Sequence, residues 1–496
     1  MRIISIITLL LIGVLSSQGR ELESHNENPN VLLIVSEDHG IHLSCYGDTI
    51  IETPNLDGIA RDGILFRNAY VTQSVCSPSR SSILTGLYPH QNGHLGLATH
   101  GHQLLGEVDN IYSLLKSAGY RTGMIGKLHV NPEGSFPIDY RRIKEGNFEK
   151  SSLPRYAKYA DTFMNSSDEP FFLMVNYPDA HWPLQGQVEG LPENPVASSD
   201  VVTFPYIGLD NERLRGITSN YYNCILRLDA CIGELTDRLS KSGKENNTLV
   251  IYLSDHGDQM ARGKYNVYEA GVKVPFMVKW PGEIKSGIES KALISSIDIV
   301  PTILDVVGVN TPENIPGKSL VPLFSDPDLS IRDFLFMEHN ADNLDDHYPR
   351  RPIRDRQSKL IYSLLQDRIN PQAKQYIMHL EHKKSEWYGS PTLEELDTSP
   401  KVIRKMYKDW LYPPKVQLFD LNADPWEFND LSMNPNYSKV KDRLLKELFA
   451  WQEKTNDPLR FPEKLKSLTI EHDTIKSSRN RKWLYLEYLY GKKNYK

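Results

Sequence analysis

The sequence predicts an α/β fold in which helices cover both faces of a large, mostly parallel sheet, with a smaller C-terminal α+β subdomain. Short, continuous apolar runs recur along the first half of the chain, and stretches of helical composition separate them. Continuous apolar runs are typical of strands buried on both faces, and helical crossovers connect parallel strands. After about residue 355 the apolar runs become shorter, which indicates a second, smaller unit.

Each strand that we predict for the large sheet is followed directly by polar residues. The runs at 31–35, 120–125, 171–175 and 249–253 lead into polar segments at 36–40, 126–129, 176–181 and 254–257. Ligands of an open parallel sheet gather beyond the carboxyl ends of its strands. We therefore expect one active site built from distant segments, with helices at 53–62, 111–118 and 212–240 between the strands.

The C-terminal region predicts strands at 359–365, 376–380 and 417–421 and a helix at 438–454. Val440, Leu444, Leu448 and Trp451 form one apolar stripe of that helix. We divide the chain into a signal peptide (1–19), a catalytic domain (20–355), a C-terminal subdomain (356–470) and a basic, aromatic tail (471–496).

The first 19 residues have the pattern of a signal peptide, which predicts that the protein is exported. Met1 and Arg2 precede an apolar run at 3–15, and Ser17-Gln18-Gly19 resembles a signal-peptidase site. The run is shorter than the roughly 20 residues that span a bilayer, so we predict no membrane span and a periplasmic or secreted location. The net charge of −6 argues against a nucleic-acid partner.

The four cysteines predict few or no disulfides. Cys224 and Cys231 lie seven residues apart in a helical pattern, which separates them by roughly 10 Å, beyond disulfide reach. Cys45 can pair with Cys224 or with Cys231, but not with both, and Cys76 belongs to a motif with another role.

Cys76 opens the pentapeptide Cys-Ser-Pro-Ser-Arg at 76–80, which leads into a predicted helix. Pro78 is tolerated in a first turn, and Gly86 is a natural helix stop. Free backbone N–H groups at a helix N-terminus favour a tetrahedral anion and lower the pKa of a thiol there. The alternative is a structural cysteine in a serine-rich turn.

This pentapeptide resembles the signature of the type I, formylglycine-dependent sulfatases of the alkaline phosphatase superfamily. The resemblance implies an alkaline-phosphatase-like fold and oxidation of Cys76 to formylglycine (3-oxoalanine) by a formylglycine-generating or anaerobic sulfatase-maturating enzyme. It also implies that one hydroxyl of the aldehyde hydrate attacks sulfur, and that deprotonation of the other expels sulfate. The segments 66–69, 88–93, 125–129 and 455–458 are most similar to the heparan N-sulfatase (N-sulfoglucosamine sulfohydrolase) branch, which includes bacterial polysaccharide sulfatases.

Two carboxylate-containing pairs, Glu37-Asp38 and Asp255-His256, follow two predicted strands and suit a divalent cation. The resemblance implies one calcium ion that also contacts the formylglycine at Cys76. Aspartate is usual in the family where Glu37 stands, and asparagine is frequent where His256 stands. Because imidazole is a weak calcium ligand, manganese and zinc stay open. The alternative role of these residues is to cap strand ends.

The resemblance assigns three cations to the sulfate site: Arg80, which stabilises the formylglycine hydrate, and Lys127 and Lys264, which contact sulfate oxygens. Lys264 stands where we associate an arginine with the animal N-sulfatase. Without its motif, each lysine would be read as solvated surface.

His129 and His181 are the predicted acid-base residues, since imidazole takes and gives protons near neutral pH. The resemblance assigns His129 to deprotonating the second hydroxyl and His181 to protonating the leaving group; the alternative is a structural histidine. Other histidines lack such a motif, although the loop 93–102 is a candidate for the pocket wall. Two interpretations are open for a later charged segment: its side chains contact the sugar, or it is a solvated loop. It contains His339, His347, Arg350 and Arg351.

We therefore expect an exported, bacterial sulfatase that removes sulfate esters or N-sulfates from sulfated oligosaccharides of ulvan or heparan type. Two other functions stay open from the sequence: a phosphonate monoester or phosphodiester hydrolase of the same superfamily, and a non-catalytic binder of sulfated glycans.

Overall fold

A computed structural model describes residues 28–341, 346–366, 368–378, 389–475 and 483–491. The predicted signal peptide lies outside these residues. The core of the molecule is an eight-stranded sheet of order β4-β3-β5-β1-β6-β7-β2-β8. Its strands are β1 (Asn30–Ser36), β2 (Ile64–Tyr70), β3 (Arg121–Ile125), β4 (Tyr140–Arg142), β5 (Phe171–Asn176), β6 (Thr248–Ser254), β7 (Phe276–Lys279) and β8 (Ile288–Ser295).

The four strands predicted from apolar runs are confirmed as β1, β3, β5 and β6. They are adjacent and parallel, in the order β3-β5-β1-β6. Ile34 of β1 lies level with Val175 of β5 and Tyr252 of β6, and Ile125 of β3 lies level with the same Val175. The polar segments that follow these strands therefore leave the sheet at one edge.

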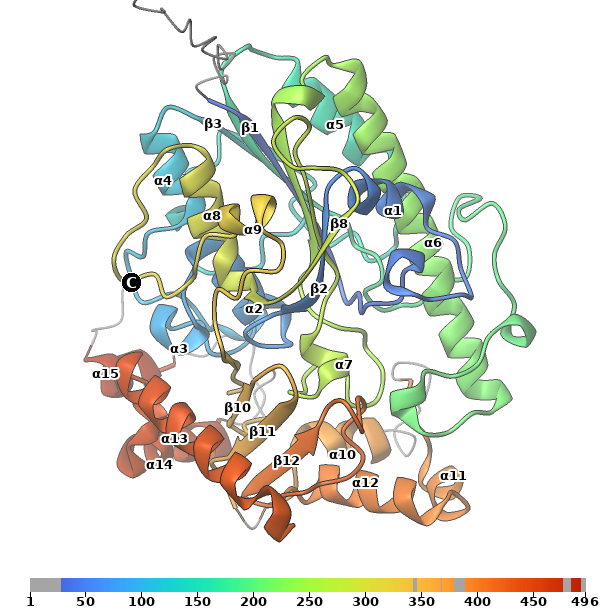
Figure 1. Cartoon of the computed structure of the whole chain (residues 1–496), viewed down its shortest axis with the longest axis vertical. Helices are drawn as coiled ribbons and strands as arrows, with labels where there is room; N and C mark the ends of the chain where they lie inside the picture. The colour runs from blue at the N-terminus through green and yellow to red at the C-terminus, as the bar shows by residue number, and fades with distance from the viewer. Residues whose placement is uncertain (1–27, 342–345, 367, 379–388, 476–482, 492–496) are drawn as a thin grey trace, which may run out of the picture.

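Helices cover both faces of the large sheet (Figure 1). Leu32 and Ile34 of β1 belong to one apolar core with α1 (Pro54–Arg61), α5 (Pro154–Met164) and α6 (Glu212–Lys241). Alternate residues of the same strand, such as Leu33, belong to a second core with α2 (Cys76–Thr85), α4 (Ile111–Ser117) and α8 (Ile299–Val306). This alternation is what a strand buried on both faces requires, and it confirms the predicted three-layer α/β arrangement.

A second, antiparallel sheet forms the smaller C-terminal region, in the order β12-β11-β10-β9. Helix α13 (Ser438–Lys454) packs on this sheet through Leu444, Leu448 and Trp451, as its predicted stripe requires. Figure 1 shows the sheet and its helices below the large domain. Its strands are β9 (Leu335–Phe336), β10 (Arg350–Arg354), β11 (Ser358–Ser363) and β12 (Val416–Asp420).

The predicted strand at 376–380 is wrong. Tyr376 and Ile377 belong to helix α10 (Pro371–Met378), and residues 379 and 380 lie outside the described part of the chain. Ala373, Tyr376 and Ile377 share an apolar cluster with Trp410 of α12 (Lys401–Leu411), because residues three and four apart lie on one helix face. The division at residue 355 stays a prediction; β9 and β10 of the small sheet precede it.

The remaining α-helices connect these layers: α3 (Pro89–Asn92), α7 (Glu269–Val272), α9 (Val321–Ser325), α11 (Leu393–Asp397), α12 (Lys401–Leu411), α14 (Pro462–Thr474) and α15 (Tyr485–Tyr490). All four cysteines lie in the described part of the chain and are free thiols, which confirms the prediction of few or no disulfides. Among the described helices, none combines the length and the apolar character needed to cross a bilayer.

Candidate active site

Cys76 is the first residue of α2, and its side chain is buried beyond the carboxyl edge of the large sheet. Val75 has an extended backbone, and the helix ends at Gly86, whose left-handed conformation (φ 71°) favours glycine. Burial alone would raise the pKa of the thiol, but the charges of Lys127, Lys264 and His256 hold it well below its usual value. The site thus favours an anion at this position.

Four residues at this edge are close enough to hold a metal ion. One ligand atom from each of Asp38, Cys76, Asp255 and His256 lies within 4.8 Å of the others, and Glu37, Asp38, Cys76 and His181 form an overlapping group. The Nε2 atom of His256 lies 3.3 Å from the Cys76 Sγ atom and 3.4 Å from Asp38 Oδ1. The two strand ends are joined directly, because the Asp38 backbone N–H donates to Asp255 Oδ1 over 3.1 Å.

Two carboxyl groups of this cluster have pKa values above their usual range. Burial raises the pKa of Glu37 from 4.5 to about 7, although Lys127 and Arg80 oppose the shift. Burial likewise raises the pKa of Asp38 against the effect of Lys264. The buried Glu37 Oε1 atom has no hydrogen-bond partner among the described residues. Glu37, Asp38 and Asp255 supply hard oxygen ligands, and Glu37 Oε1 receives no hydrogen bond from the described part of the chain, so these three side chains fit a divalent cation.

The three predicted cations converge on these carboxylates. Lys127 Nζ donates to Glu37 Oε2 over 2.6 Å, and Lys264 Nζ donates to both Asp38 oxygens over 2.9 and 2.8 Å. Arg80 Nε donates to Asp255 Oδ2 over 3.1 Å. Arg80 Nη2 also lies 3.7 Å from Glu37 Oε1, so each predicted cation pairs with at least one predicted metal ligand.

Asn176 is a site residue to which the sequence analysis gave no role. Its Oδ1 atom accepts a hydrogen bond of 2.7 Å from Arg80 Nη1, whose second acceptor is the Lys127 carbonyl at 3.0 Å. Gly126 permits the close approach of its own backbone to that of Asn176, because a Cβ atom at residue 126 would lie 2.2 Å from the Asn176 carbonyl oxygen. The position of Asn176 directly after a predicted strand was the signal that could have found it.

His129 and His181 both lie at the cluster. Burial and the charge of Lys127 lower the pKa of His129 to about 4, although contact with Cys76 opposes this. Charged neighbours that act on the His129 ring include Lys127, Arg80 and Cys76. Burial, with Lys264 and Lys127, holds the pKa of His181 well below its usual value, and its Nδ1 atom lies 2.7 Å from the Trp182 carbonyl.

Phe148 is a second residue near the site that the sequence analysis missed. Its ring stacks on His181 with a centroid distance of 4.1 Å, and Lys127 Nζ lies 5.2 Å from its ring centroid. Phe148 is an isolated aromatic residue in a polar loop, and this isolation was the signal that could have found it.

The segment around residue 350 is not a solvated loop, because His339, His347, Arg350 and Arg351 are all buried. Arg351 donates to both oxygens of Asp457 over 2.7 and 3.0 Å, which occupies its guanidinium with an internal ion pair. The loop 93–102 also turns inward, with His94 and His102 buried.

A buried thiol at a helix N-terminus, beside cations and hard carboxylates, is suited to holding a tetrahedral anion while its central atom is attacked. The class that this fold and site define is therefore a hydrolase of sulfate or phosphate esters. The chain belongs to the sulfatase family, whose model matches residues 29–309. A second model, described as N-sulphoglucosamine sulphohydrolase, C-terminal, matches residues 257–373.

Individual relatives confirm the predicted branch and fold. The chain is 30% identical to a human N-sulphoglucosamine sulphohydrolase, over 91% of this chain and 93% of the relative. It is 28% identical to an ulvan-active sulfatase of Formosa agariphila, over 90% of this chain and 86% of the relative. A solved structure of BT4656 in complex with D-glucosamine-2-N,6-O-disulfate has a TM-score of 0.65 and 22% identity, covering 87% of this chain and 98% of that one.

Proposed function

We propose that this protein is an exported sulfatase that removes sulfate esters or N-sulfates from the sugars of a sulfated polysaccharide. The named activities of its relatives favour ulvan and heparan-type glycosaminoglycan as substrate classes. The observation that carries the proposal is the position of Cys76, at a helix N-terminus among Lys127, Lys264 and the carboxylate cluster.

The nucleophile in this proposal is formylglycine made from Cys76 by a maturation enzyme, and its hydrated aldehyde supplies a hydroxyl group that attacks sulfur. Lys127 and Lys264 lie where they neutralise the oxygens of a sulfate group held at this position. Arg80 fixes the Lys127 carbonyl, just after β3, and the Asp255 carboxylate, since it donates to both. These cations explain why an anionic group is stable in a buried site.

The proposed metal is one calcium ion, which Glu37, Asp38, Asp255, His256 and residue 76 would hold. It would supply a Lewis acid that withdraws negative charge from the sulfate group. The residues fit such an ion, because buried carboxylates with raised pKa values gain stability from an added divalent charge. The imidazole of His256 keeps manganese and zinc open as alternatives.

His129 and His181 divide the proton transfers in the proposed reaction. With a pKa of about 4, His129 is neutral at pH 7 and is able to take a proton from the group at position 76. His181 gives a proton to the leaving group. Its pKa is low in this structure, and an adjacent sulfate anion would raise it.

A pair of variants tests the proposal. Cys76→Ala should abolish sulfate release from sulfated oligosaccharides while leaving the fold and glycan binding intact. Cys45→Ala, at a free thiol outside the metal-ligand cluster, should release sulfate at the wild-type rate. Unchanged sulfate release by Cys76→Ala would falsify the nucleophile assignment. Paired 4-nitrophenyl sulfate and phosphate esters separate the proposal from a phosphoester hydrolase, which would prefer the phosphate.

A further inference from the structure

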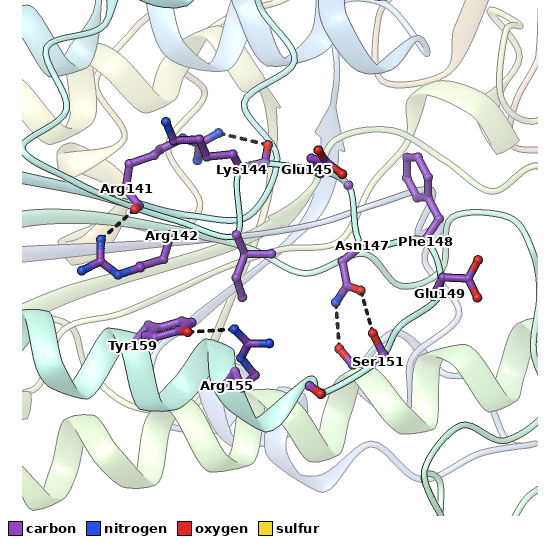
Figure 2. A pocket seen from close by; sticks show the side chains of 13 residues that line it. Arg141, Arg142, Lys144, Glu145, Asn147, Phe148, Glu149, Ser151, Arg155 and Tyr159 are labelled. Atoms are coloured by element: carbon purple, nitrogen blue, oxygen red, sulfur yellow. Dashed lines mark hydrogen bonds between the residues drawn. The ribbon is translucent and has the colours of Figure 1, made fainter.

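A pocket of about 890 Å³ opens beside the active site, between the end of β4 and the first turns of α5. Figure 2 shows its lining side chains, with Arg141, Arg142 and Lys144 on one side and Arg155 with Tyr159 on another. Its volume lies in the range of pockets that enclose small-molecule ligands. We refer to it as the basic pocket, lined by residues 141–149, 151, 152, 155 and 159.

The basic pocket has four cations and two carboxylates, those of Glu145 and Glu149, which leaves an excess of positive charge. Within the described chain, none of the four cations lies within 4.0 Å of a carboxylate oxygen. Their hydrogen bonds go to neutral oxygens: Arg142 Nη1 donates to the Arg141 carbonyl over 2.9 Å, and Arg155 Nη2 donates to the Tyr159 hydroxyl over 2.9 Å. The guanidinium groups therefore keep their capacity to bind an anion.

The basic pocket and the active site share a wall. Phe148 lines the pocket, stacks on His181 at 4.1 Å and lies 5.2 Å from Lys127 Nζ. Arg141 Nη1 donates to the carbonyl of Gly126, the residue before Lys127, over 2.5 Å. A ligand that extends out of the active site past Phe148 therefore enters the basic pocket.

We infer that the basic pocket binds a sulfate or carboxylate group on a second sugar unit of the chain whose terminal sulfate lies at Cys76. This inference rests on the proposed function and adds that the enzyme prefers oligosaccharides with repeated anionic groups over simple sulfate esters. In this proposal the guanidinium groups pair with the anion. Asn147 and Ser151, which hydrogen-bond to each other (Figure 2), complete the polar part of the lining.

The test is the double variant Arg142→Glu/Arg155→Glu, since both side chains are exposed and replacing them leaves the core intact. The control is Lys158→Glu/Lys408→Glu, which makes the same change in net charge at exposed positions outside the pocket. Two substrates are compared: a sulfated tetrasaccharide, prepared from heparin and from ulvan, and 4-nitrophenyl sulfate, which is too small to reach the pocket.

We expect the ratio of kcat/KM for the tetrasaccharide to kcat/KM for 4-nitrophenyl sulfate to fall about tenfold or more in the pocket variant. The control should keep the wild-type ratio. Added NaCl should lower the wild-type ratio and leave that of the pocket variant almost constant, because salt screens exposed charges. An unchanged ratio in the pocket variant overturns the inference.

A binding measurement separates failure of this inference from failure of the proposed function. In the Cys76→Ala background, the same tetrasaccharides are titrated by calorimetry. Their Kd should be about tenfold higher when Arg142→Glu and Arg155→Glu are also present. If the mature protein hydrolysed no sulfate ester, the proposed function would fail, and the titration would still decide about the pocket. Equal Kd values with and without the pocket substitutions overturn the inference.

Discussion

Glu269→Gln tests whether a buried ion-pair network supports the segment that carries Lys264. Glu269 begins α7, five residues after Lys264. One of its carboxylate oxygens accepts hydrogen bonds from Tyr70 and Arg354, each 2.7 Å long, and the other accepts one of 3.1 Å from Lys359. Arg354 and Lys359 belong to β10 and β11, so the network joins this segment to the small sheet.

The contribution of the Glu269 carboxylate to the free energy of unfolding follows from its pKa. Burial alone would raise this pKa, but Arg354, Lys359 and Lys273 together lower it from 4.5 to about 2. A difference of that size corresponds to roughly 3 kcal/mol of folding free energy at pH 7. Because the folded-state pKa is lowered, this contribution is present above pH 4.5 and is lost as pH falls toward 2, with roughly 1.4 kcal/mol left at pH 3.

Urea unfolding of wild type and Glu269→Gln at pH 7 and at the lowest pH where both stay folded measures this contribution. The control is Glu289→Gln, which removes one partner of the exposed Arg67–Glu289 pair and should change stability by about 0.5 kcal/mol or less. The reasoning is refuted if Glu269→Gln costs no more than the control, or if its cost does not shrink as pH falls.

Three other predictions concern the active site. Lys264→Ala should lower kcat on sulfate esters by about 10²-fold or more, since it removes a buried cation from the site; steady-state kinetics would contradict this with a loss below tenfold. His181→Asn should slow esters of poorly acidic alcohols more than 4-nitrophenyl sulfate, because a good leaving group needs no proton; equal losses on both substrates would argue against His181 as the acid. Chelation should abolish activity, and added Ca²⁺ should raise the Tm of wild type but not of Asp255→Asn; an identical Tm increase in both would place the ion elsewhere.

The parts of the fold that the sequence predicted are those with continuous apolar runs. Strands β1, β5 and β6 are fully buried, and β3 is buried except at Arg121, so few polar residues interrupt them. In contrast, β2 contains Arg67 and Asn68 at partly exposed positions, and its pattern did not distinguish it from a loop. The error at 376–380 arose because three apolar residues in a row fit one turn of a helix as well as a short strand.

The residues of the candidate site were predictable from motifs that follow strand ends. The hydrogen bonds and ring contacts between these residues were not. The sequence indicated Arg80 and Asp255 separately, while their 3.1 Å contact depends on how α2 approaches β6. Phe148 lies in a loop without periodicity, so only the three-dimensional structure brings it against His181. The sequence also did not predict the burial of Arg351, because its ion-pair partner Asp457 lies more than a hundred residues away in the chain.

The proposed sulfatase chemistry depends most directly on the conversion of Cys76 to an aldehyde. Mass spectrometry of the peptide that contains Cys76, in preparations matured to different extents, measures the fraction in which a CH₂SH group has become a CHO group. Sulfate release per molecule of protein should rise in proportion to that fraction and vanish where the thiol is intact. Full activity in a preparation whose Cys76 is entirely thiol would rule out formylglycine as the nucleophile.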